Sequence, residues 1–260
     1  MSGFKCLRVD SSTDGIRTLS LDRPPVNALG RALVAELGRA WVLLREDAAA
    51  RCMILRTAGK HFCAGADLKE RQGMSEDEVR AFVPLLAALC NDLAALPFPT
   101  IAVVRGTAAG GGCELALACD LRVLADDASI GLRETSLAIL PGAGGTQRLP
   151  RIAGLARAKR WIFSARLFTA AEALADGVAD RVARLEALEE EARSLAGEIV
   201  ANGPVAVRLA KRAIDGGFDL PLGRALALEW ECYQGTLATE DRYEGLRAFA
   251  EKRPPRFQGR

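Results

Sequence analysis

Short apolar runs separated by turn-forming residues dominate the first half of the chain, and helical patterns dominate the second half. Leu7–Val9 and Ile16–Leu21 lie on either side of the turn signal Ser11–Gly15 and are expected to form strands. The apolar runs Arg51–Arg56 and Thr100–Val104 predict two buried strands. Two further short strands are expected at Leu121–Leu124 and Ser129–Gly131.

Helices are expected between several of these strands. Asn27 is a candidate cap for a helix over Arg31–Arg45. Ser75 opens the capping pattern Ser-Glu-Asp-Glu, which predicts a helix from there towards Leu96, and Pro84 predicts a break or a second start inside it. This strand–loop–helix succession indicates an α/β fold with active loops at the strand ends.

Beyond Thr146 the pattern is mainly helical. The pair Gly203-Pro204 interrupts this region, so we expect a core over residues 1–202 and a C-terminal helical oligomerisation region over residues 203–260. The expected helices are Leu155–Ser164, Ala170–Asp176 with Thr169 as its cap, Leu185–Ala201, Val205–Asp215, Leu222–Gly235 and Asp241–Glu251.

Composition limits the classes of partner. The 260 residues fit one large α/β domain with room for a small appendage, and half of them are apolar, so a sizeable core is available. The net charge of +2 is too balanced to argue for nucleic acid or an anionic membrane as a partner. No apolar run reaches membrane-spanning length without a charge or a glycine.

The seven cysteines are scattered, with no CxxC pair and no zinc spacing, so we predict reduced thiols and no metal. The N-terminus carries neither an apolar signal core nor an Arg/Ser-rich transit segment. A cytoplasmic location is expected, or the mitochondrial matrix if a transit peptide has been removed.

Gly110-Gly111-Gly112 opens a segment that then reads as a helix and carries Glu114 in its first turn. The first turn of a helix has unpaired N–H groups at a positive dipole end, and glycine allows a ligand to approach the backbone closely. Glu134 follows twenty residues later, before the glycine-rich stretch Pro141–Gly145. A backbone that can hold an anion beside two acids points to chemistry on a carbonyl compound.

Two other kinds of site are disfavoured. His61 is the one histidine of the chain and lies in a loop-like stretch without a GxSxG elbow, so a loop histidine is favoured over a catalytic base. Gly142–Gly145 lacks the lysine and the spacing of a P-loop. We interpret Pro141–Gly145 as a turn that shapes a pocket before a helix beginning at Gln147.

Three motifs, at Phe62–Lys69 (FCAGADLK), Gly110–Glu114 (GGGCE) and Pro141–Arg148 (PGAGGTQR), resemble the enoyl-CoA hydratase/isomerase, or crotonase, superfamily. FCAGADLKER, ELALACDLRV and EKRPPR look most like its methylglutaconyl-CoA hydratase members that also bind AU-rich RNA. The resemblance implies a spiral of ββα units, with C-terminal helices that build trimers, often paired into hexamers.

The resemblance also implies roles for individual residues. The N–H groups of Ala66 and Gly111 match an oxyanion hole, which stabilises the charge that develops on a thioester oxygen. Glu134 matches the acid that protonates the α-carbon, and Glu114 matches the partner that positions and activates water. Taken singly, Glu114 could be a helix N-terminal acid stabilised by the dipole and Glu134 a solvated loop acid.

Further positions match contacts to coenzyme A, which is part of the substrate, so no separate cofactor is expected. Asp67 could instead cap a helix, and Lys252 could be a solvated cation at a helix end. The tail positions resemble residues that reach the coenzyme A of a neighbouring subunit. The six positions are Ala64, Asp67, Leu68 and Lys69 near the oxyanion hole, and Phe249 and Lys252 in the tail.

The two glutamates favour hydration of a 2-enoyl-CoA with a short or branched acyl chain to the 3-hydroxyacyl-CoA. The alternatives are a double-bond isomerase on the same scaffold and a methylglutaconyl-CoA hydratase with secondary RNA binding. The RNA-binding relatives carry a lysine comb where this chain has Arg31, Ala35 and Arg39, so RNA binding is not expected. Ala109 and Arg105 also depart from the usual pattern, which could alter the pocket shape without removing the N–H donors.

Overall fold

The computed structural model describes residues 3–260 and contains two sheets. The larger sheet has the order β1 (Leu7–Ser11), β2 (Ile16–Leu21), β3 (Cys52–Thr57), β4 (Thr100–Val104), β6 (Leu121–Ala125) and β9 (Arg181–Ala183). The smaller sheet has the order β5 (Thr107–Ala109), β7 (Ser129–Gly131) and β8 (Phe168–Thr169). In the larger sheet β1 pairs with β2 antiparallel and the other neighbours are parallel, whereas the smaller sheet has one parallel and one antiparallel pair.

The chain passes from the larger sheet to the smaller one and then into a helix, and it repeats this path. β4 leads into β5 and then into helix α4 (Gly111–Leu117), while β6 leads into β7 and then into the 3-10 helix η1 (Glu134–Leu137). After β3 the chain touches the smaller sheet at a bridge between Cys63 and Ala108. The predicted α/β spiral of ββα units is therefore confirmed.

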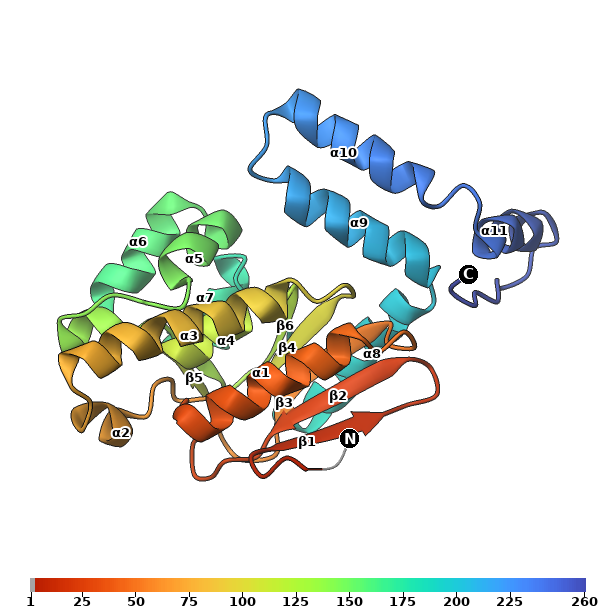
Figure 1. Ribbon diagram of the computed structural model, residues 1–260. Coiled ribbons are helices and arrows are strands. Elements are labelled where there is room, and N and C mark those ends of the chain that lie inside the picture. The colour runs from red at the N-terminus through yellow and green to blue at the C-terminus, as the bar shows by residue number, and fades with distance from the viewer. Residues whose placement is uncertain (1–2) are drawn as a thin grey trace.

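Helices cover both faces of the larger sheet (Figure 1). Helix α1 (Arg31–Arg45) contacts β1 and helix α3 (Glu76–Ala94), while α8 (Leu188–Val200) contacts β3, β4 and β6. The strands between them are almost entirely buried, as their continuous apolar runs predicted. This core fixes the positions of the loops at the strand ends.

Two local predictions were wrong. Asn27 does not cap α1, because the cap position is Gly30. The Asn27 side chain is buried and binds the backbone, accepting from the Arg23 N–H and donating to the Phe62 carbonyl. Pro84 does not break α3, which runs unbroken through it. Pro84 is exposed, so water can bind the carbonyl that proline leaves without a helical partner.

Several short elements had no clear signal in the sequence. They are β5, β8, β9, α2 (Leu68–Gln72) and η1. The expected helix Leu185–Ala201 is divided into the 3-10 turn η2 (Leu185–Ala187) and α8, and helix α5 (Gly145–Ala153) begins two residues before its expected start. Helices α6 (Leu155–Ser164) and α7 (Ala170–Ala175) agree with the prediction.

The last helices stand apart from the sheets (Figure 1). α9 (Pro204–Gly217) and α10 (Leu222–Gln234) pack on each other as a hairpin, and α11 (Glu240–Ala250) follows. The main buried apolar cluster contains no residue from 203–260, all of which the structure describes. The expected boundary coincides with the start of α9, and a separate role for 203–260 stays a prediction. Among residues 3–260, no helix is both long and apolar enough to span a bilayer.

Candidate active site

The N-terminus of α4 is the centre of the candidate site. The preceding residue, Gly110, has φ 54° and ψ −124°, a conformation that side chains with a Cβ rarely adopt. A Cβ on Gly112 would lie 2.1 Å from the Cys63 carbonyl oxygen, so α4 packs directly against that backbone. The glycines of this segment therefore serve both the turn and the close packing.

Two backbone amides border one small space beside α4. A Cβ built on Gly111 would lie 3.8 Å from the Ala66 nitrogen, and one on Gly65 would lie 3.0 Å from the Gly111 nitrogen. Within residues 3–260, neither the Ala66 N–H nor the Gly111 N–H donates a hydrogen bond, while Asp67 and Gly110 on either side do. The two predicted oxyanion-hole donors thus lie together.

Glu114 is buried in the first turn of α4. Its Oε1 accepts hydrogen bonds from the Ala143 N–H at 2.7 Å and the Gly145 N–H at 2.8 Å. Burial raises the pKa of Glu114, and the two N–H donors and the positive charge of Arg148 oppose that rise. The carboxylate is therefore desolvated and held in one orientation.

Glu134 is the first residue of η1 and is half-buried, so it is not a solvated loop acid. Its Oε2 is buried and has no hydrogen-bond partner among the described residues. Burial, and next the charge of Glu114, raise the pKa of Glu134 to about 7. This acid can therefore hold or release a proton near neutral pH.

The two carboxylates have different surroundings. Two N–H donors stabilise the ionised form of Glu114. Within residues 3–260, Glu134 has one carboxylate oxygen without a hydrogen-bond donor, and its raised pKa favours the protonated form. Two acids whose environments separate their proton affinities can act as base and acid in one reaction. Beside a pair of unoccupied N–H donors, they suit chemistry next to a thioester carbonyl.

Comparisons with known proteins agree with this arrangement. The sequence model described as enoyl-CoA hydratase/isomerase matches residues 11–260. The chain belongs to the enoyl-CoA hydratase/isomerase family. It is 50% identical over 252 residues to human enoyl-CoA hydratase domain-containing protein 2, mitochondrial, covering 95% of this chain and 86% of that protein. It is 48% identical over 257 residues to human methylglutaconyl-CoA hydratase, mitochondrial, covering 96% of this chain and 76% of that protein.

A solved structure gives the same result. The crystal structure of an enoyl-CoA hydratase from Bacillus anthracis superimposes with a TM-score of 0.96 at 46% identity, and the match covers 98% of this chain and all of that one (100%). The superfamily resemblance and the fold prediction are therefore confirmed. The chain is an enzyme, and these named relatives are enoyl-CoA hydratases, which are hydro-lyases.

The residues predicted to contact coenzyme A lie in two places, one next to Ala66 and one in the C-terminal tail. Ala64, Leu68 and Lys69 are exposed on either side of Ala66. Asp67 caps α2 by accepting from the Glu70 N–H, and it pairs with Arg23 at 2.8 Å. The bond from Arg23 is also the main reason that the pKa of Asp67 is lowered. Asp67 thus has the capping role considered as its alternative.

The tail positions lie away from this site within one chain. Phe249 is 86% exposed in the last turn of α11, and Lys252 follows that helix with φ 52°. Figure 1 shows α11 beyond the α9–α10 hairpin, far from α4. The fold of a single chain therefore does not bring Phe249 or Lys252 to Glu114.

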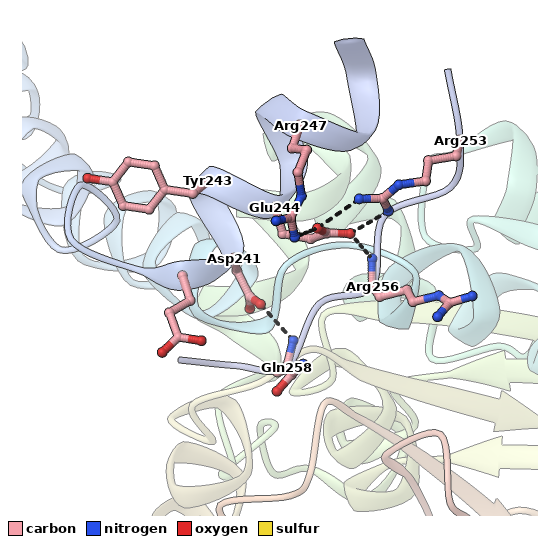
Figure 2. A pocket seen from close by; sticks show the side chains of 8 residues that line it. Asp241, Tyr243, Glu244, Arg247, Arg253, Arg256 and Gln258 are labelled. Carbon is pink, nitrogen blue, oxygen red and sulfur yellow. Dashed lines mark hydrogen bonds and ion pairs between the residues drawn. The ribbon is translucent and has the colours of Figure 1, made fainter. Parts of the chain in front are cut away.

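Charged contacts fix the segment after α11 (Figure 2). Glu244 accepts from Arg253 at 2.6 Å and from the Arg256 N–H at 2.9 Å, and Asp241 accepts from the Gln258 N–H at 2.6 Å. Arg253 is the first of the groups that hold the pKa of Glu244 far below its usual range. This network gives the tail a defined path back along α11.

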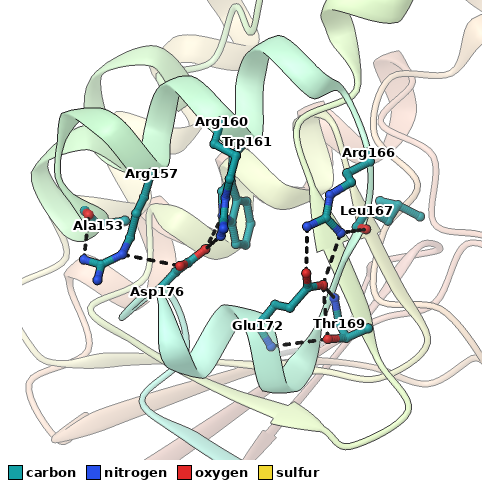
Figure 3. Close-up of polar contacts among 9 residues, drawn as sticks. All are labelled: Ala153, Arg157, Arg160, Trp161, Arg166, Leu167, Thr169, Glu172 and Asp176. Atoms are coloured by element: carbon teal, nitrogen blue, oxygen red, sulfur yellow. Dashed lines mark hydrogen bonds and ion pairs between the residues drawn. The ribbon is translucent and has the colours of Figure 1, made fainter.

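A second polar network joins α7 to α6, the helix that contacts η1 (Figure 3). Asp176 accepts from the Trp161 indole N–H at 2.7 Å and from Arg160, which ties α6 to the end of α7. The Thr135 hydroxyl, next to Glu134, donates to the Ile162 carbonyl of α6 at 2.6 Å. Thr135 has no functional signal in the sequence, because nothing local indicates that α6 binds the turn with Glu134.

Proposed function

We propose that this protein adds water to a 2-enoyl-CoA thioester and produces the 3-hydroxyacyl-CoA, reversibly, with a short or branched acyl chain. The observation that carries the proposal is the pair of buried Glu114 and half-buried Glu134 next to the Ala66 and Gly111 amides. Relatives named enoyl-CoA hydratase and methylglutaconyl-CoA hydratase support the same reaction class.

The proposed reaction begins with the thioester oxygen between the N–H groups of Ala66 and Gly111. As water attacks the β-carbon, the electrons of the double bond move towards the thioester and negative charge grows on that oxygen. Two preformed donors stabilise this charge, and the loss of one such donor costs about 3–4 kcal/mol in other enzymes. The donors favour the transition state because the ground-state oxygen carries less charge.

The two glutamates handle the protons. Ionised Glu114 accepts a proton from water while the water oxygen forms a bond to the β-carbon. Protonated Glu134 gives its proton to the α-carbon. The product has gained one water in total, and a proton then passes from Glu114 to Glu134 to restore the starting state. The pKa of about 7 keeps Glu134 partly protonated at neutral pH.

Isomerisation is the second candidate, because the family includes isomerases. Moving a double bond takes one proton from the substrate and returns one, so a single acid–base group suffices. The second buried carboxylate, Glu114, favours hydration. Product analysis with a 3-enoyl-CoA separates the two, because an isomerase forms the 2-enoyl-CoA and accumulates no 3-hydroxyacyl-CoA.

We do not expect RNA binding. Arg31 pairs with Glu78 at 3.0 Å, and Arg39 lies 3.7 Å from Glu36 and over the Phe4 ring. These partners reduce the positive charge available to phosphates. A salt-dependent affinity for AU-rich RNA would contradict this expectation.

We further propose a trimer or a pair of trimers, assembled through 203–260. Many large apolar side chains of these helices are exposed, which is costly unless another subunit covers them. They lie on each of α9, α10 and α11, and Trp230, for example, is 56% exposed. The exposed positions, on these helices and in the turns after α9 and α10, are Ile214, Phe218, Leu220, Leu222, Leu226, Trp230, Tyr233, Leu237, Tyr243, Leu246 and Phe249. Such an assembly gives Phe249 and Lys252 access to a neighbour's substrate.

The compartment stays a prediction. All seven cysteines are free, as expected where thiols stay reduced. Relatives named as mitochondrial and a Bacillus subtilis relative match at similar identity, 50% and 47%.

The proposal is tested by measuring hydration of crotonyl, longer straight-chain, 3-methylcrotonyl and 3-methylglutaconyl thioesters. We expect turnover of at least one short or branched thioester. No hydration of any of them by the folded protein would overturn the proposed function.

A further inference from the structure

The turn Pro141–Gly145 makes contacts on two sides. On one side the amides of Ala143 and Gly145 donate to Glu114. On the other side the Ala143 carbonyl accepts from the Arg148 Nη1 at 2.9 Å. Arg148 thus binds the same peptide segment whose N–H groups orient the buried carboxylate.

Arg148 is itself held in place. Its Nη2 donates to Asn91 Oδ1 on α3 at 2.6 Å, and its backbone N–H donates to the Gly144 carbonyl at 2.8 Å. Gly144 has φ 106°, and a Cβ there would lie 2.0 Å from Arg148 Nη1. The planar guanidinium therefore lies directly over the turn and connects it to a long helix.

We infer that Arg148 is a positioning residue for Glu114, which it reaches through the Pro141–Gly145 turn. Four of the five residues in that turn, at positions 142–145, are glycine or alanine, so the segment has few side-chain contacts of its own. The guanidinium supplies the constraint, because its two nitrogens join the turn to α3. This inference rests on the proposed function in that it takes Glu114 as the group that activates water.

The charges around Glu114 predict how the loss of Arg148 changes its titration. Facing it are Glu134 from η1, Arg148 from α5, and the thiols of Cys113 and Cys90 from α4 and α3. Arg148 is the cation of this set. Its removal takes away a positive charge and loosens two N–H donors that stabilise the ionised carboxylate. The protonated form of Glu114 therefore becomes more stable relative to the ionised form.

The test compares Arg148→Met with Arg151→Met. Arg151 lies on the same helix, but within residues 3–260 its side chain bonds only Gln147 and the exposed Asp219, so it is a matched control. For Arg148→Met we expect kcat for hydration to fall about tenfold or more while KM changes less than about threefold, because misplaced catalytic groups affect mainly the chemical step. The acidic limb of the kcat profile should move to higher pH, because Glu114 must be ionised to accept a proton.

A double variant tests whether Arg148 acts through Glu114. In the Glu114→Gln background, Arg148→Met should lower kcat little further, because non-additivity identifies residues that act together. Full additivity, or a single variant that behaves like Arg151→Met, would overturn the inference. If Arg148→Met does not fold, Asn91→Ala removes the anchor of the guanidinium and should lower kcat in the same direction; an unchanged kcat and pH profile would then overturn it.

A measurement independent of turnover keeps the inference separate from the proposed function. The ¹³C NMR titration of the Glu114 carboxyl carbon, assigned by its loss in Glu114→Gln, should show a higher pKa in Arg148→Met than in wild type and Arg151→Met. An unchanged titration contradicts the inference, whereas a wild-type protein that hydrates no thioester contradicts the proposed function.

Discussion

Gly110 leaves the space that the Glu134 carboxylate occupies: a Cβ at residue 110 would lie 3.0 Å from Glu134 Oε1. The positive φ of Gly110 also turns the chain into α4. One glycine therefore serves both the helix that carries Glu114 and the placement of Glu134.

Gly110→Ala should lower hydration turnover by about tenfold or more, because the new methyl group displaces Glu134 and a displaced catalytic group costs rate steeply. The strained φ should also lower the free energy of unfolding by about 1–3 kcal/mol. Steady-state kinetics and urea titration check the two effects. Gly223→Ala, with open space around its Cβ position, is the control. Wild-type turnover in folded Gly110→Ala would show that Glu134 does not need this space.

Gly111→Pro removes the N–H that should meet the thioester oxygen. Proline is tolerated at the first position of a helix, and a Cβ at residue 111 meets chiefly the end of the Leu29 side chain, at 3.1 Å. We expect a folded oligomer with hydration lowered by about 10²-fold or more. Gly111→Ala keeps the N–H and adds the same Cβ, so it should retain more activity. Normal hydration by folded Gly111→Pro would remove Gly111 from the oxyanion hole.

The raised pKa of Glu134 predicts a pH-dependent cost in stability. Its pKa is about 7 in the folded protein against an ordinary value of 4.5, so the folded state binds more protons between these values. Stability from this group is therefore present below about pH 4.5 and is lost as the pH rises through about 7. Glu134→Gln removes the titration and should raise the melting temperature at pH 8 relative to wild type, with a smaller difference at pH 5. Equal differences at both pH values would contradict the raised pKa.

The exposed apolar face of α10 predicts subunit contact. Light scattering of the purified protein should give the mass of a trimer or a hexamer. Trp230→Asp should shift the mass towards the monomer, because a charge in an apolar interface has no partner. Arg224→Asp, which changes charge at an exposed position less than two turns away on α10, is the control. A monomer mass for wild type at micromolar concentration would contradict both the assembly and a role for Lys252 at a neighbour's site.

Local signals predicted the centre of the site better than its surroundings. The three glycines and Glu114 are adjacent in sequence, so the start of α4 could be read directly. The turn with Glu134 is bound to α6 through the Thr135 hydroxyl, and the Arg148 guanidinium is bound to Asn91 on α3. Such contacts between distant segments leave no periodic pattern in the sequence.

The same reason explains the errors in the fold. Asn27 has the composition of a helix cap, but its side chain is used to bind the backbone around Phe62. Pro84 has the local signal of a break, but Phe82 and Leu86 are buried on either side and keep α3 continuous. Tertiary packing decided both positions against the local preference.

Turnover of a short 2-enoyl-CoA thioester by wild type, Glu114→Gln and Glu134→Gln tests the central claim most directly. Glutamine keeps the size of each side chain and removes its proton chemistry. We predict that wild type forms the 3-hydroxyacyl-CoA and that each variant, folded and assembled like wild type, loses at least about 10²-fold in kcat, the low end for general acid–base catalysis. Near-wild-type hydration by either variant would contradict the claim that the two buried carboxylates share the reaction.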